Sequence, residues 1–140
     1  MKRIIFIGLC LVFLTGCGSG NSKKLNCTHK GITDKTEFNV VFDKKGERVE
    51  SYTLTVIHSH GDGHNIDNEY QNALGYCAHV KQGFGSEMSC KVSENGEELI
   101  VTTSVTISQL SEKQISELNV ELGSYEKVKK SLESQGAVCK

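Results

Sequence analysis

The chain has 140 residues, a formal net charge of −1, six cysteines, no proline and no tryptophan. This length suits one domain with a modest core, which excludes most large catalytic scaffolds. The balanced charge lacks the basic excess that nucleic-acid binding requires, so we expect no nucleic-acid partner. Hydrophobic residues make up 37% of the chain and charged residues 24%, which is typical of a globular rather than a disordered protein.

The N-terminal residues have the pattern of an export signal. Lys2 and Arg3 precede an apolar run, Ile4 to Leu14, that only Gly8 interrupts. A helix of about eleven residues is too short to cross a hydrocarbon core of about 30 Å. The run is therefore typical of a secretory signal peptide rather than of a transmembrane helix.

The next residues, Leu14-Thr15-Gly16-Cys17, resemble the lipobox of bacterial lipoproteins. The resemblance implies that the Cys17 thiol carries a diacylglyceryl group and that the chain is cleaved before Cys17, with acylation of the new N-terminus in many species. The alternative is an ordinary signal peptide with a chance cysteine. We expect lipid anchoring at the extracytoplasmic face of a cell membrane, with the bilayer as partner. The expected divisions are a signal peptide at 1–16, a lipidated cysteine and flexible tether at 17–24, and one globular domain at 25–140.

Alternating apolar residues predict most of the strands. Phe38, Val40 and Phe42 predict a half-buried strand. The turn residues from Asp43 to Gly46 lead into a returning strand, on which Tyr52, Leu54 and Val56 continue the alternation. Asn95-Gly96 lies between two later alternating runs and is a strong hairpin signal. The expected strands are residues 24–28, 38–42, 52–58, 88–92 and 99–107.

Two main helices are predicted by apolar residues at helical spacing. The first main helix has an apolar face made of Ile66, Tyr70, Ala73, Leu74 and Cys77. A shorter helix is expected at Ser111, which matches a capping box with Gln114. The second main helix covers residues 125–132, with Ser124 as its N-cap and Gly136 just past its end.

The predicted order of elements is β-β-β-α-β-β-α. Neighbouring hairpins without strand–helix–strand alternation favour an α+β fold over a doubly wound one. We expect an antiparallel sheet of four to five strands, built from hairpins, with the two main helices packed on one face.

The cysteines predict two disulfides. Cys10 lies in the signal peptide and Cys17 is assigned to the lipid, which leaves an even number outside the cytoplasm. Three pairings are open. Position favours Cys77–Cys90, because both lie on predicted core faces of consecutive elements, and this leaves Cys27–Cys139. No Cys-x-x-Cys spacing indicates a redox-active pair.

A histidine-rich segment follows the third predicted strand. His58, His60, His64 and Asp62 offer the nitrogen and oxygen ligands that zinc prefers. The segment resembles the His-x-His-x-Asp-His motif of the metallo-β-lactamase superfamily. Two features differ from that family, since Gly63 is inserted before the last histidine and the chain is too short for its αββα sandwich.

The alternative is that this segment has only a structural role, as a polar loop between a strand and a helix. Gly61 and Gly63 would then form the turn, and Asp62 or Asn65 would cap the helix. Ser59 and Ser86 lack the Gly-x-Ser-x-Gly turn of a serine nucleophile. We therefore expect no catalytic residues and no enzyme activity, and no cofactor apart from the zinc that the histidines would take.

Several short motifs together resemble the YehR-type small bacterial lipoproteins. They are the lipobox, the tether, Lys24-Leu25-Asn26-Cys27-Thr28, the central hairpins, and the segment from Leu132 to Lys140. The resemblance implies an envelope location and an α+β fold, and carries over no catalytic residue. We expect a non-enzymatic lipoprotein that binds an envelope protein or a small ligand. The alternative is a zinc-capturing lipoprotein that uses the His58–His64 segment.

Overall fold

The computed structural model describes residues 21–59 and 66–140. Its strands are β1 (Lys24–Lys30), β2 (Asp34–Phe42), β3 (Val49–Ser59), β4 (Met88–Glu94), β5 (Glu98–Thr106) and β6 (Val138–Cys139). Its helices are α1 (Ile66–Phe84), α2 (Glu112–Glu117) and α3 (Tyr125–Ser134), with a 3-10 turn at Ile107–Gln109. No helix within these ranges is long and apolar enough to cross a membrane.

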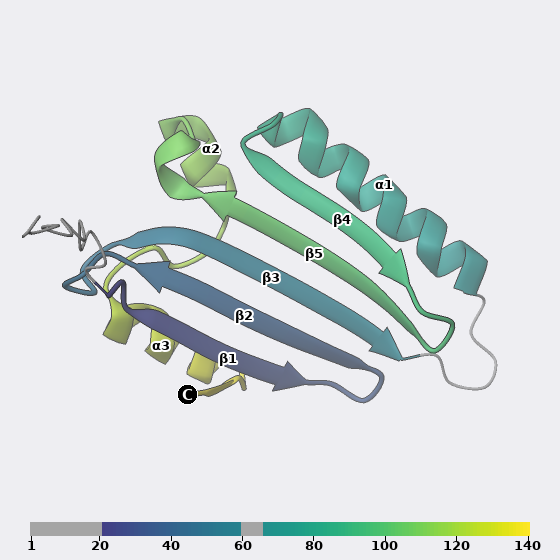
Figure 1. The fold of residues 1–140 in the computed structure, drawn as a ribbon, viewed down its shortest axis with the longest axis horizontal. Helices are drawn as coiled ribbons and strands as arrows, with labels where there is room; N and C mark the ends of the chain where they lie inside the picture. Colours follow the sequence, from purple (N-terminus) through teal and green to yellow (C-terminus); the bar gives the residue numbers. More distant parts are fainter. Residues whose placement is uncertain (1–20, 60–65) are drawn as a thin grey trace, which may run out of the picture.

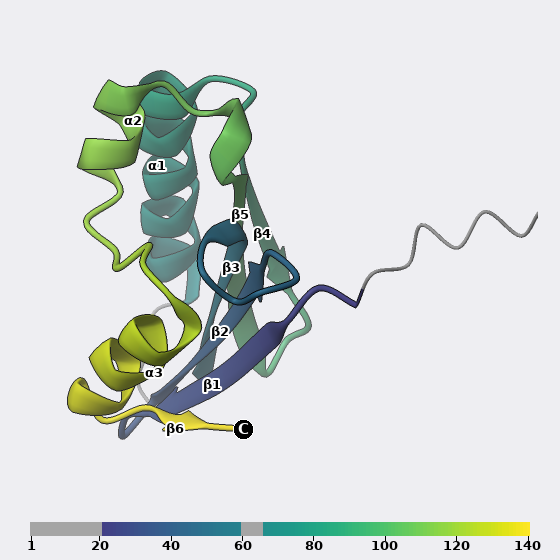
Figure 2. The same cartoon turned by 90° about the vertical axis from the view of Figure 1, so that its left-hand side faces the viewer.

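The described strands form one sheet in the order β4-β5-β3-β2-β1-β6, and every neighbouring pair is antiparallel (Figure 1). Figure 2 shows α1, α2 and α3 on the same face of this sheet. The opposite face carries no helix of the described residues. These features confirm the predicted α+β class, with helices on one side of a hairpin-built sheet.

Two details differ from the prediction. The described sheet has six strands instead of four to five, because the two-residue strand β6 pairs with Cys27 and Thr28 of β1. Ser124 is the N-cap of α3, but its hydroxyl makes no capping hydrogen bond. The first amide of the helix, at Tyr125, instead donates to the Gly46 carbonyl at 2.8 Å. The capping box of Ser111 and Gln114 is present at the start of α2, as predicted.

The β2–β3 turn shows how local chemistry shapes the hairpins. Gly46 has a φ of +72°, a conformation that glycine adopts without a steric penalty. The Asp43 carboxylate accepts a hydrogen bond of 2.8 Å from the Glu47 amide. This bond is the main reason why the pKa of Asp43 lies below its ordinary value, because it favours the ionised form. The turn therefore keeps a charged acceptor at neutral pH.

The core is divided into two parts beneath two separate helices. The larger part packs α3 against β1 and β2, and its most buried side chains are Leu25, Val40, Phe42 and Val128. The smaller part lies under α1 and contains Ala73, Leu99 and Val101. The central strand β3 runs between the two helices, and its Leu54 and Val56 are only half-buried.

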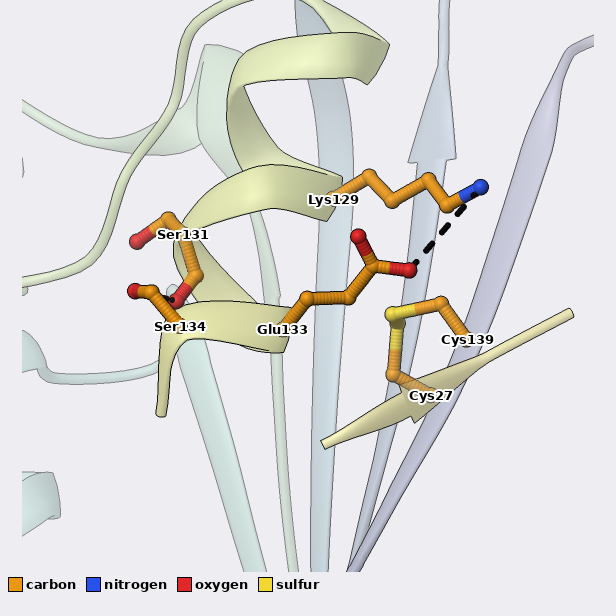
Figure 3. Close-up of a disulfide and its surroundings, with 6 residues drawn as sticks. All are labelled: Cys27, Lys129, Ser131, Glu133, Ser134 and Cys139. Carbon is orange, nitrogen blue, oxygen red and sulfur yellow. Dashed lines mark hydrogen bonds and ion pairs between the residues drawn. A yellow bond between two sulfur atoms is a disulfide. The ribbon is translucent and has the colours of Figure 1, made fainter. Parts of the chain in front are cut away.

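The four cysteines of the described domain form two disulfides. Cys27 pairs with Cys139 and joins β1 to β6, while Cys77 pairs with Cys90 and joins α1 to β4. Figure 3 shows the first bridge beside the last turns of α3, where Lys129 lies 3.9 Å from Glu133. Of the three possible pairings, the structure contains the one that position favoured.

Candidate ligand-binding groove

An apolar groove lies between α1 and the helix-bearing face of the sheet. Its volume is about 480 Å³, and β3, β5 and α1 contribute its walls. We call it the α1 groove, and its apolar lining consists of Leu54, Val56, Ala73, Tyr76, Leu99 and Val101.

Strand register places these side chains together. Leu54 and Val56 are two residues apart on β3 and therefore point to the same face of the sheet. Val56 lies opposite Val101 of β5, and Leu54 lies opposite Thr103. The small side chain of Ala73 lets α1 approach Leu99 and Val101 closely. The pairing of β3 with β5 therefore forms the floor of the groove.

The groove is open because α1 and α3 stand apart over the sheet. α1 contacts β4 and β5, whereas α3 contacts β1 and β6, and the strip above β3 lies between them. A second, smaller cavity of about 170 Å³ continues along this strip toward α3 and shares Leu54 with the first. Tyr52 lines the second cavity, and burial raises the pKa of its phenol to about 12. Tyr52 therefore stays neutral at physiological pH.

A few polar groups interrupt the apolar lining. His58 and Glu69 lie in the lining, and Nδ1 of His58 is 4.0 Å from Oδ1 of Asp34 on the neighbouring strand. Thr103 is a polar residue of the floor and only 4% exposed. Its hydroxyl lies 3.9 Å from Sγ of Cys90. Apolar walls with a few polar groups are typical of sites for small molecules.

The predicted zinc ligands are only partly described. His58 lies near the end of β3, whereas His60, Asp62 and His64 lie outside the described residues. Among residues 21–59 and 66–140, no cluster of three or more His, Cys, Asp or Glu side chains is placed to hold a metal ion. The zinc site therefore stays a prediction. Cys17, the predicted lipidation site, also lies outside the described residues.

The sequence did not reveal the groove. Alternation on β3 predicted that Leu54 and Val56 face the core, without showing that their outer surface stays uncovered. Leu74 was predicted on the buried face of α1, but it is 40% exposed. The reason is that α1 sits over the β4–β5 side of the sheet and buries only a narrow stripe, which includes Ala73 and Val80.

Two solved structures have a fold similar to that of this chain. The chain matches no family model, and no curated protein matches its sequence. The NMR structure of the Escherichia coli YehR protein superposes with a TM-score of 0.65 at 8% identity, covering 84% of this chain and 90% of that one. An NMR structure of a protein from Streptococcus pneumoniae TIGR4 superposes with a TM-score of 0.62 at 13% identity, covering 100% and 98%. The chain is thus similar to YehR in its fold.

Proposed function

We propose that the chain is a lipid-anchored extracytoplasmic protein whose domain binds a small, mainly apolar molecule in the α1 groove. The observation that carries this proposal is the groove itself, an apolar cleft of about 480 Å³. That volume lies within the range of about 300–1,000 Å³ that is typical of small-molecule sites. The lipobox-like residues before and at Cys17 support the anchor.

The chemistry of the groove indicates what kind of ligand would fit. Leu54 and Val56 are half-buried, so a bound apolar molecule would remove their remaining surface from water. Burial of apolar surface is the main favourable contribution to such binding. His58 and Glu69 offer polar contacts to one part of the ligand. We therefore favour an apolar molecule with one polar group over a sugar or a nucleotide.

A charge placed in the groove should weaken binding of an apolar probe. We expect Val56→Glu to weaken binding of the neutral dye Nile red by at least about tenfold, because the ligand would bury an unpaired carboxylate. The matched control is Ile57→Glu, which adds the same charge to the adjacent residue on the opposite face of β3. Fluorescence titration of residues 21–140 measures both affinities. Equal binding by the two variants, or no binding by the unmodified domain, would contradict the proposed site.

The anchor is tested separately. We expect mass spectrometry of the membrane fraction to find a mature chain that begins at Cys17 and carries a thioether-linked diacylglyceryl group. Cys17→Ser should remove this modification completely, because a hydroxyl does not replace the thiolate as acceptor. Cys10→Ser is the matched control and should leave the lipid in place, since residue 10 precedes the expected cleavage site. An unmodified Cys17 in the wild-type protein would refute the anchor.

A further inference from the structure

We call the face of the sheet opposite α1, α2 and α3 the helix-free face. It carries more basic than acidic side chains, although the described domain as a whole is acidic. The described residues contain 14 Lys and Arg against 16 Asp and Glu. Alternation along the strands gives the helix-free face the acidic side chains Glu37 and Glu98, and the exposed Glu50 lies at the irregular pairing of β3 with Val41 and Phe42. Its basic side chains are Lys24, Lys30, Lys35, Lys91 and Lys140.

Three of these lysines gather at the β1–β6 edge. Lys30 and Lys35 lie directly opposite each other on β1 and β2. The Lys140 backbone amide donates to the Asn26 carbonyl at 2.9 Å, which holds the end of the chain beside β1. Lys30, Lys35 and Lys140 together line a shallow depression of about 580 Å³. We call these three residues the lysine edge.

Negative charge offsets the lysine edge only in part. Lys35 forms an ion pair with Glu37. Within the described residues, neither Lys30 nor Lys140 has a carboxylate partner within 4.0 Å, and both are exposed. Counting the Glu37 carboxylate and the α-carboxylate that Lys140 carries in residues 21–140, the three lysines keep a net charge of about +1 toward solvent.

The rest of the helix-free face carries both apolar and hydroxyl side chains. The apolar ones are Val41, Ile57, Ile100 and Val138. Hydroxyl groups follow the central strands, where Thr53 and Ser104 lie 3.0 Å apart and Thr55 and Thr102 lie 3.5 Å apart. A hydroxyl can donate a hydrogen bond to water or to a phosphate oxygen of a lipid headgroup. The face thus combines lysines with hydroxyls.

A short tether joins the predicted anchor to the domain. β1 begins at Lys24, and the tether of about seven residues from Cys17 reaches at most roughly 25 Å. Attraction between lysines and an anionic bilayer acts within about one Debye length, roughly 10 Å at moderate salt. An anchored domain therefore stays close enough for the lysines to reach the headgroups.

We propose that the helix-free face, centred on the lysine edge, lies against anionic phospholipid headgroups when Cys17 is anchored. This inference rests on the lipid anchor of the proposed function. The helices lie on the opposite face of the sheet (Figure 2) and would then point away from the bilayer. The α1 groove, which α1 lines, would point away with them. The groove would stay open to ligands while the domain is held at the membrane.

Cosedimentation with vesicles tests this orientation without the anchor. Residues 21–140 contain every described strand, helix and disulfide, so this fragment is used. We expect it to bind vesicles made of equal parts phosphatidylcholine and phosphatidylglycerol, and to bind them less as the salt concentration rises. It should not bind vesicles of pure phosphatidylcholine. Lys30→Glu/Lys35→Glu/Lys140→Glu should weaken binding at least about tenfold, because each lysine near an anionic surface strengthens binding about fivefold.

The matched control is Lys81→Glu/Lys113→Glu/Lys130→Glu, which makes the same change of charge on the three helices. It should retain most of the binding. Lys30→Gln/Lys35→Gln/Lys140→Gln, which removes charge without reversing it, should give an intermediate loss, and circular dichroism checks that each variant is folded. Equal losses in the two triple Glu variants, equal binding to both vesicle types, or tighter binding to soluble polyglutamate than to vesicles would overturn the inference. Because the fragment has no Cys17, a failure here is distinct from a failure of the anchor.

Discussion

Removing the Cys27–Cys139 disulfide with Cys27→Ala/Cys139→Ala is expected to lower the free energy of unfolding by about 4–5 kcal/mol. The two cysteines are 112 residues apart in the sequence. In the chain-entropy model, a bridge that closes a loop of about 100 residues stabilises the fold by about 4.7 kcal/mol, because it restricts the unfolded chain. A loss of this size is a large share of the roughly 5–15 kcal/mol by which domains are stable.

Contacts of the bridge in the folded state should add to the loss of stability. Cys27 is 2% exposed and belongs to the core cluster that contains Leu25 and Phe42. β6 has only two residues in its pairing with β1, so the bridge is the main covalent constraint on the chain end. Urea unfolding of the oxidised proteins measures the loss, with Cys77→Ala/Cys90→Ala as the comparison. A loss no larger than in that comparison would show that loop length does not set the contribution of these bridges.

The hairpins were predictable because their signals are local. Asn95 illustrates this, since its side chain accepts hydrogen bonds from the amides of Glu97 and Glu98, at 3.0 and 2.8 Å. Gly96 follows with a φ of +87°, which an L-residue with a side chain rarely adopts. These interactions occur within a few residues, so the sequence contains the information needed to place the turn.

Features that depend on distant parts of the chain were not predictable in the same way. Val138–Cys139 is too short to show alternation, so the sequence contained no period that indicates β6. Leu54 and Tyr52 have the same alternation on β3, but Tyr52 is 7% exposed and Leu54 is half-buried. The difference depends on where α1 and α3 cross the sheet. Hydrophobic periodicity predicts the face of a residue and not what covers it.

The position of α1 also depends on the second disulfide. Among the residues whose burial the structure describes, α1 buries few side chains against the sheet, and the core cluster beneath it consists of Ala73, Leu99 and Val101. Its C-terminal end leads into β4 through Gly85, whose amide donates to the Lys81 carbonyl at 2.9 Å. Cys77, near the middle of α1, is bonded to Cys90 on β4. We therefore expect the bridge to hold the helix over the sheet and to maintain the α1 groove.

Cys77→Ala/Cys90→Ala should accordingly lower the free energy of unfolding by about 3 kcal/mol and weaken Nile red binding at least about tenfold. The stability term follows from a bridge between residues 13 apart, close to the loop length for which the entropy model gives about 3 kcal/mol. The binding loss follows because a detached α1 no longer supplies Ala73 and Tyr76 to the groove. Hydrogen exchange distinguishes this local effect from general weakening, since α1 amides should lose protection before those of β3. Unchanged protection of α1, or dye binding equal to that of the unmodified domain, would show that packing alone positions the helix.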